Sequence, residues 1–490
     1  MRWLFVAVFI GLGVCVTLDD GMGNLFASDS GVDAKKVDAA VKRGVAWLKA
    51  QQTAEGCWVV KAGQAAAASG IGQPLEALYP DGTTALVLFA LLKGGVPPSD
   101  SVIKKGFAWL RKQPFKRVYS VSCLILALSA LYQPNNDLEK RIEKETDPKK
   151  IARLKTKALK ESSDERKRKS WRKRATPADR KLMEDAVRWL IQHQQKNIWR
   201  YPGPMPGATQ PDQESEDFSN TQYAMLALHE AHRLGIQIPQ QTWIKVVEYC
   251  LRSQEASGPE VPWFPVPAAD FDISHLKKIE KQVRRQLSDM YKKEARAGAT
   301  AEELRKSRTV AINPYKKKRK YGAEKKKMYA RGWRYRSEGN EPYCGSMTTS
   351  GVAALVICKA ALEGSAYYKQ NKEKINKAIR DGAAWLAHNF TVTTNPGRPG
   401  MWHYYYLYGL ERAGVLSLCL RFGKHDWYEE GANFLLGAQR ADGSWPSDGM
   451  ISALSNTCFA ILFLKKATTP VIGGGKKLVI ATGKGMFGGK

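Results

Sequence analysis

Apolar and polar residues follow a pattern that repeats six times along this chain. Each repeat begins with a segment that has a helical stripe of apolar residues, and continues with a segment that is apolar on nearly every side. The amphipathic segments are centred on Trp47-Leu48, Trp109-Leu110, Trp189-Leu190, Tyr249, Trp385-Leu386 and Phe434-Leu435. The apolar segments are Thr83–Leu92, Val121–Leu131, Asn220–Leu234, Thr349–Leu362, Tyr404–Leu416 and Asn456–Leu464. We therefore predict six pairs of α-helices, each with an outer amphipathic and an inner apolar helix.

The two ends of the array indicate how the pairs are arranged. Repeats of this size stack on their neighbours, because one pair cannot bury its own apolar faces. An open superhelix needs polar capping repeats, yet the first repeat, Val41–Leu92, and the last, Tyr428–Leu464, match the shared pattern best. We therefore predict an all-α fold, an (α/α)6 toroid of six outer and six inner helices. An open superhelix is the alternative.

A short motif ends some of the outer helices. It consists of a Gln, a glycine-containing turn and a Trp, and its copies are Gln52 with Trp58, Gln439 with Trp445 and, in part, Gln194 with Trp199. The motif resembles the QW motif of squalene cyclases and prenyltransferase-type proteins, and the resemblance covers residues 37–470 apart from two insertions. It implies an α/α toroid in which Gln bonds free backbone groups and Trp fills the gap between outer helices. We expect Trp58 and Trp445 to be buried near the seam between the last and first repeats.

The catalytic motifs of proteins with this fold are missing from the sequence. The alkene-protonating D-x-D-D motif of cyclases is absent, and Asp270-Phe271-Asp272 is its nearest counterpart. His403 stands where prenyltransferases place a zinc-binding His, but the Asp-x-Cys pair that would complete the site is missing. A thioester motif is missing as well. We expect no metal and no cofactor, and the resemblance leaves open whether the protein is an enzyme.

The positive charge of the chain is large and unevenly distributed. The 490 residues include 77 Lys and Arg against 47 Asp and Glu, a formal net charge of +30. Most of the excess lies in residues 139–181 and 272–331, which are rich in Lys, Glu, Arg and Ala. We predict two basic insertions made of exposed helices with poor apolar faces and of disordered stretches. Charge runs are usually solvated surfaces, and the alternative is that they bind an anionic partner.

The first 27 residues have the features of an export signal. Arg2 precedes the uncharged segment Trp3–Leu18, which Asp19 ends, and this length suits the core of a signal peptide better than a membrane span. We predict export to the periplasm or cell envelope, with an uncleaved N-terminal membrane anchor as the alternative. Residues 471–490, rich in Gly and Lys, are expected to form a flexible tail.

Aromatic residues gather in the loops before the inner helices, which open at one end of such a ring. We predict that these loops line a pocket in which His403 carries a proton near neutral pH and Asp217 lies at the edge. The candidate ligand-binding residues are Tyr201, Asp217, Tyr335, Trp402, Tyr404 and Tyr405. Repeat packing is the alternative role for the aromatic residues, helix capping for Asp217, and a structural hydrogen bond for His403.

Two functions are consistent with these features. The first is binding of an apolar, isoprenoid-like molecule in the aromatic-lined cavity, with or without catalysis. The second is a non-catalytic scaffold of the cell envelope that holds a protein, an anionic polymer or a membrane surface through its rim and basic insertions. Nucleic acid is not an expected partner, because the chain has an export signal and no recognised nucleic-acid module.

Overall fold

The computed structural model describes residues 14–18, 31–60, 79–133, 137–161, 164–200, 217–305, 308–312, 327–448, 451–468 and 470–471. Helices account for 65% of the structure and strands for almost none of it, which confirms the all-α class. Of the expected signal segment, Val14–Leu18 is described and forms strand β1. The rest of residues 1–27, and all of the expected tail except Val471, lie outside the described residues.

All six predicted helix pairs form. The amphipathic helices are α1 (Ala34–Ala50), α3 (Ser101–Leu110), α8 (Pro177–Gln192), α10 (Gln240–Ser253), α15 (Ala366–His388) and α17 (Trp427–Ala438). The apolar helices, called the buried helices below, are α2 (Pro80–Lys93), α4 (Val118–Leu131), α9 (Phe218–Leu234), α14 (Gly345–Leu362), α16 (His403–Ser417) and α18 (Ala453–Leu464). Among the described helices, α14 is the one with the length and apolar character of a membrane span, and 89% of it is buried within the protein.

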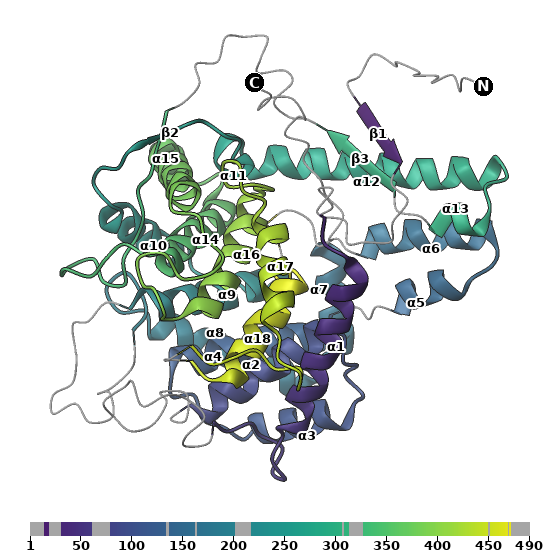
Figure 1. Ribbon diagram of the computed structural model, residues 1–490, viewed down its shortest axis with the longest axis horizontal. Helices are drawn as coiled ribbons and strands as arrows, with labels where there is room; N and C mark the ends of the chain where they lie inside the picture. Colours follow the sequence, from purple (N-terminus) through teal and green to yellow (C-terminus); the bar gives the residue numbers. More distant parts are fainter. Residues whose placement is uncertain are drawn as a thin grey trace.

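The buried helices contact one another in a cyclic order. Helix α2 packs against α4, α4 against α9, α9 against α14, α14 against α16, and α16 against α18. The last of them, α18, packs against α2 and also against α1, so the last repeat touches the first (Figure 1). Each amphipathic helix packs on one or two buried helices, and its polar face remains exposed.

The Gln and Trp of the motif join neighbouring repeats, and four copies share the same hydrogen bonds. The Trp indole donates to a carbonyl in its own amphipathic helix, and the Trp backbone N–H donates to a Thr hydroxyl in the next buried helix. The Gln amide donates to a carbonyl of the next amphipathic helix around the cycle. The four units are Gln52–Trp58–Thr84, Gln194–Trp199–Thr221, Gln254–Trp333–Thr348 and Gln439–Trp445–Thr457. The bonds that Gln was expected to make are therefore present.

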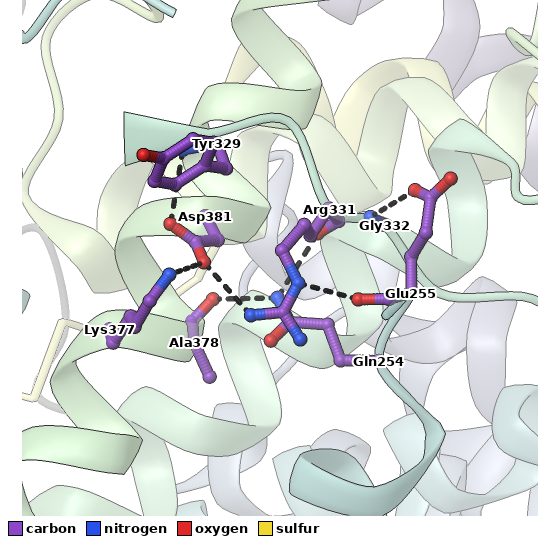
Figure 2. Close-up of polar contacts among 8 residues, drawn as sticks. All are labelled: Gln254, Glu255, Tyr329, Arg331, Gly332, Lys377, Ala378 and Asp381. Atoms are coloured by element: carbon purple, nitrogen blue, oxygen red, sulfur yellow. Dashed lines mark hydrogen bonds and ion pairs between the residues drawn. The ribbon is translucent and has the colours of Figure 1, made fainter. Parts of the chain in front are cut away.

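The unit of Gln254 and Trp333 is not recognisable in the sequence, because the second insertion separates its two members. Gln254 follows α10 and donates to the carbonyls of Arg331 and Ala378, at 3.1 and 3.0 Å. Figure 2 shows the amide of Gln254 between these two carbonyls. The fold thus closes this motif across a long excursion of the chain.

The chain returning from the second insertion is fixed by one buried carboxylate. Asp381 of α15 is 0% exposed and accepts hydrogen bonds from Arg331 Nη1 at 3.1 Å and from the backbone N–H of Tyr329 at 3.2 Å. Lys377, one turn earlier on α15, also donates to it (Figure 2). The Gly332 N–H donates to the Glu255 carboxylate at 3.0 Å. These bonds hold the segment before Trp333 against α10 and α15.

Trp58 and Trp445, both expected between the last and first repeats, lie at two different boundaries between repeats. Both Trp58 and Trp445 are 0% exposed, as expected. Trp445 packs on α1 so closely that a Cβ on Gly44 would lie 2.8 Å from the ring, which places it between the last and first repeats. Trp58 packs on Gly106 of α3 instead, between the first and second repeats. The expectation was therefore correct for Trp445 and wrong for Trp58, because each Trp reaches forward to the next amphipathic helix.

The two basic insertions pack against each other. The first forms α5 (Asp137–Lys144), α6 (Pro148–Glu161) and α7 (Asp164–Arg174), and the second forms α12 (Ile273–Arg296) and α13 (Ala301–Arg305). Helix α6 lies along α12, and together with α5 and α13 they extend from one side of the protein (Figure 1). We call α5, α6, α12 and α13 the basic arm. Helix α7 packs on α9 instead.

The basic arm has an apolar interior, which corrects the expectation of exposed helices with poor apolar faces. The side chains that α12 buries are Ile273, Leu276, Ile279, Glu280, Val283, Leu287, Tyr291 and Ala295. Lys155 of α6 donates to the Arg305 carbonyl at 3.0 Å, and its ammonium lies 4.7 Å from the Tyr291 ring centroid. Each helix has a weak stripe when considered alone, and the two stripes become one buried interface when paired.

The remaining described elements are short. Strand β1 pairs antiparallel with β3 (Arg308–Ile312), with Val14 opposite Ile312. Strand β2 (Glu260–Val261) pairs with β4 (Met328–Tyr329), and α11 (Pro267–Asp270) packs on α15 and α16. The β2–β4 pair packs against α15 and ties the second insertion to the body at its base, whereas β3 lies on α12 of the arm.

Candidate functional site

Two of the predicted ligand-binding residues meet at the first turn of α9. Asp217 is the N-cap of this helix, and its carboxylate accepts from the Asn220 N–H at 2.9 Å and from the Ser219 hydroxyl at 2.8 Å. The Phe218 N–H donates to the Tyr335 carbonyl at 3.3 Å. Burial raises the pKa of Asp217, and the hydrogen bonds from Asn220, Ser219 and Tyr335 oppose this shift. Helix capping, the alternative role, accounts for the geometry of this carboxylate.

Tyr405 lies further inside the protein, where hydrogen bonds link side chains of three buried helices. The Gln222 amide of α9 donates to the Tyr405 hydroxyl of α16, and the Ser350 hydroxyl of α14 donates to the Gln222 oxygen at 2.7 Å. The Tyr405 ring stacks on Tyr223, with 6.0 Å between ring centroids. Tyr405 therefore faces the space that the buried helices enclose.

His403 and Tyr404 contact a different set of residues. The His403 ring lies 5.3 Å from Tyr404 and 4.9 Å from Phe434 of α17, and its Nε2 lies 2.8 Å from the Val392 carbonyl oxygen. This carbonyl requires the proton on Nε2. Burial lowers the pKa of His403, and the hydrogen bond to Val392 opposes this shift. The backbone N–H of His403 donates to Asp448 at 2.6 Å. The residues predicted to share one pocket thus form two groups.

Two predicted residues remain, Trp402 and Tyr201. Trp402, just before α16, adopts a left-handed backbone with φ of 53°, and the Arg398 guanidinium lies 5.7 Å from its ring. Tyr201 lies outside the described residues. Among the described residues, the structure therefore brings Asp217 together with Tyr335, with Tyr405 nearby, and His403 together with Tyr404.

A pocket lies at the opposite ends of the buried helices, where α2, α4 and α9 terminate. Its cavity volume is about 20 Å3, which is room for about one water molecule. Its deeper wall is apolar and consists of Phe89, Leu126, Leu226 and Tyr408. Lys93, Ser129, His229 and Glu230 form its polar lip, about one helical turn further along these helices. Gln133, which follows α4, and Thr468, which follows α18, complete the lip. The chain after α18 completes the wall with Ala467. The pocket is therefore apolar inside and charged at its mouth.

The charges at the mouth are paired. Glu230 accepts from the Ser129 hydroxyl at 3.1 Å and from Arg233 at 3.3 Å. Burial alone would raise the pKa of Glu230, but Arg233 and Lys93 outweigh it and hold the carboxylate ionised. Burial lowers the pKa of Lys93, and Glu230 opposes this shift. This cluster can bind a ligand's polar end and is a poor proton donor.

A second buried carboxyl lies behind the mouth. Glu411 of α16 accepts from the Thr468 N–H at 3.0 Å and from its hydroxyl at 2.6 Å. Burial raises the pKa of Glu411 to about 7, and the two bonds from Thr468 oppose this shift. The carboxyl therefore ties the segment after α18 to α16, and it changes charge near neutral pH.

Sequence reasoning missed this region. Its loops carry no aromatic cluster, and Lys93 and Glu230 have the appearance of ordinary solvent-facing helix ends. One signal was present: Glu411 and Arg412 are two adjacent charges within a helix that is otherwise apolar on all sides. Both side chains are 0% exposed in the structure.

Neither a metal site nor similarity to known proteins assigns a function to these residues. The described residues contain no group of three or more His, Cys, Asp or Glu that could hold a metal ion. A scan against protein-family models finds no match, and a search of curated proteins finds none. The geometry of the chain itself is therefore the basis for inferring its function.

Proposed function

We propose that this protein is an α/α toroid of the squalene cyclase type that binds an apolar small molecule within the cycle of its buried helices. The observation that carries the proposal is the pocket, whose deep wall of Phe89, Leu126, Leu226 and Tyr408 comes from four buried helices. Concave sites with an apolar wall and a few polar groups at the edge are the usual form of small-molecule sites.

The arrangement of the repeats supports the toroid. The cyclic order of contacts returns from α18 to α2, and Gln439 of the last repeat donates to the Ala40 carbonyl of α1 at 2.9 Å. The same bond joins the other repeats that carry the motif. An open superhelix has no neighbour for its last motif, so this bond favours ring closure.

Aromatic side chains extend the apolar surface beyond the pocket. The Tyr408 ring stacks on Phe459 of α18 at 5.8 Å, and Phe459 lies 5.8 Å from Tyr405. A ligand that enters at the helix ends would therefore meet aromatic faces on its way inward. Binding needs no catalytic step, and the ion pairing of Glu230 supports a binding role at the mouth.

Lipid analysis of the purified protein tests this proposal. Organic extraction followed by mass spectrometry should recover an apolar compound in a stoichiometric amount. Ala467→Leu, which fills part of the pocket, should reduce its retention, whereas Ala438→Leu on α17 outside the pocket should not. Recovery of no compound, together with no binding of added apolar molecules, would refute the proposal.

A second candidate function rests on the basic arm. Lys277, Lys281, Arg285, Lys292 and Arg296 are exposed, and the helical period places them on the face of α12 opposite its buried stripe. These five positions extend over about 29 Å of helix. The described part of the arm exposes no large apolar side chain, which favours a linear anionic polymer over a membrane as the partner.

Charge reversal distinguishes this scaffold function from an ordinary solvated surface. Lys277→Glu, Lys281→Glu and Arg285→Glu combined should abolish retention on a polyanion matrix at low salt. The matched triple reversal of Lys104, Lys105 and Lys112, which are exposed near α3, should have a smaller effect. Equal losses in the two variants would show that only net charge matters.

A further inference from the structure

Arg412 is a fully buried cation in the interior of the protein. Its side chain is 0% exposed, and none of its three guanidinium nitrogen atoms makes a hydrogen bond of ordinary geometry to a described residue. The Tyr408 hydroxyl is the polar group beside it, and the guanidinium opposes the effect of burial on the pKa of this hydroxyl. The guanidinium carbon lies 4.0 Å from the Tyr408 ring centroid and 5.8 Å from that of Tyr405. Its surroundings are therefore aromatic faces rather than acceptors.

The fold satisfies a buried cation elsewhere, so this state is a particular feature of Arg412. Lys359 of α14 is also 0% exposed, yet its ammonium donates to three acceptors. These are the carbonyls of Ala268 and Phe271, at 2.7 and 2.9 Å, and the Asn376 side chain at 2.7 Å. A structural cation in this protein is thus provided with oxygen atoms, and Arg412 is not.

No carboxylate in the described part of the chain hydrogen-bonds to Arg412, although the charge of Arg412 opposes the effect of burial on the pKa of Glu411. The adjacent Glu411 directs both of its oxygen atoms to Thr468. A guanidinium does not release its proton in proteins, so the group cannot avoid the desolvation penalty by becoming neutral. Stacking on Tyr408 offsets only part of that penalty. A counter-anion from outside the chain would remove the rest.

The guanidinium lies where such an anion could reach it. Arg412 does not line the pocket itself, but its guanidinium carbon lies 4.0 Å from the ring centroid of Tyr408, which does. Tyr408 thus contacts both the pocket and the guanidinium. A group that passes Tyr408 from the pocket therefore meets Arg412.

We propose that Arg412 binds the anionic group of an amphiphilic ligand, a carboxylate or a phosphate, whose apolar part lies along the pocket wall. This inference rests on the proposed function and names the ligand class of the same site. The planar fork of the guanidinium matches both anions, which can accept two parallel hydrogen bonds from it. The tyrosines around it accommodate an alkyl or isoprenoid chain directly beside the anion.

Three probes of equal chain length test this inference on the full-length protein after removal of bound lipid. They are decanoate, decyl phosphate and the neutral decan-1-ol, and the measurements are equilibrium binding and thermal melting. The wild type should bind at least one anionic probe about tenfold or more tighter than the alcohol, because hydrogen bonds to charged groups give this discrimination. The tighter of the two anions distinguishes a carboxylate ligand from a phosphate ligand.

The decisive variant is Arg412→Met, with Arg188→Met on the exposed face of α8 as its control. Arg412→Met should lose the preference for anions and keep its affinity for the alcohol. Without ligand, it should melt about 2 °C or more above the wild type, because the buried unpaired charge is gone. Arg188→Met should change neither property. Arg412→Lys, which keeps the charge but not the fork, should keep a reduced preference.

The two proposals fail in distinguishable ways. If the wild type binds the alcohol as tightly as the anions, or if Arg412→Met keeps the preference, the anion site is refuted while the apolar pocket stands. An Arg412→Met variant that melts below the wild type would mark the guanidinium as a structural partner of Tyr408 and would also refute the inference. If the wild type binds none of the three probes, the proposed function itself is wrong.

Discussion

Truncation of Trp445 tests whether the contact between the last and first repeats stabilises the fold. The side chain is 0% exposed, packs on Gly44 of α1, and donates to the Leu435 carbonyl at 2.8 Å. In Trp445→Ala, the cavity would lie between the two repeats, so the cost reports on that seam alone. Trp333→Ala is the matched change at an interior seam, because Trp333 is equally buried and donates to the Cys250 carbonyl at 2.9 Å.

The expected loss follows from these contacts. Removing a buried Trp side chain costs about 3–5 kcal/mol through lost burial and the remaining cavity. This range includes the loss of the indole bond, which leaves a buried carbonyl without its donor. Both Trp445→Ala and Trp333→Ala should therefore lower the free energy of unfolding by about 3–5 kcal/mol. Trp109→Ala, at a half-buried position on α3, should cost clearly less.

Urea unfolding followed by circular dichroism measures the three variants without relying on tryptophan fluorescence. Equal losses for Trp445→Ala and Trp333→Ala would support a closed cycle in which every seam contributes. A loss below about 1 kcal/mol for Trp445→Ala, with the full loss for Trp333→Ala, would mean that the last seam opens before the protein unfolds. The toroid would then be refuted in favour of an open superhelix.

Three further predictions concern other parts of the structure. Asp381→Ala should lower the free energy of unfolding in urea by about 3–5 kcal/mol, because Arg331 loses a buried partner. Asp185→Ala on the exposed face of α8 should change it little, and equal effects of the two variants would contradict the role of the buried cluster. Deletion of residues 273–312 alone should cause aggregation in size-exclusion chromatography, because the apolar face of α6 becomes exposed. Deletion of residues 137–161 as well should restore a monomer. Aggregation of both deletion variants would show that the body is not stable without the arm. The wild type should lose stability as the pH rises from about 5 to about 7. Burial raises the pKa of Glu411 from an ordinary value of 4.5 to about 7, so the folded state holds the proton more strongly than the unfolded state does. Thermal melting of Glu411→Gln should show a flatter profile over this range, and an unchanged profile would contradict the assignment.

The helix pairs could be predicted from the sequence because their information is local. Apolar residues on one stripe or on all sides distinguish the amphipathic from the buried helices within a single segment. The same holds for Gln52 and Trp58, which lie close enough along the chain to be recognised as one motif. Gln254 and Trp333 make the same bonds, yet they are far apart in sequence, and only the folded chain identifies them as partners.

The candidate site could be predicted only in part, because its contacts depend on pairing between repeats. Aromatic loops before the buried helices indicated one end of the molecule, and there Asp217 and Tyr335 do meet. The pocket lies at the other end, where Lys93 and Glu230 come from helices that are distant in the sequence. The apolar interior of the basic arm was missed for the same reason, since α6 and α12 each have a weak stripe until they are paired.

The divided motif of Gln254 and Trp333 shows where this architecture accepts foreign sequence. In the other three units the Gln and Trp are separated by a short turn, whereas here the second insertion with α12 and α13 occupies that place and the hydrogen bonds are unchanged. The hydrogen bonds of Gln and Trp therefore form the unit, and the length of the chain between these two residues does not affect them. A reporter or binding domain grafted at the exposed turn residues Ala54-Glu55 or Ala441-Asp442 should be carried on the periphery of the protein in the same way. The turns between Gln and Trp in different repeats are therefore equivalent sites for the insertion of other sequences.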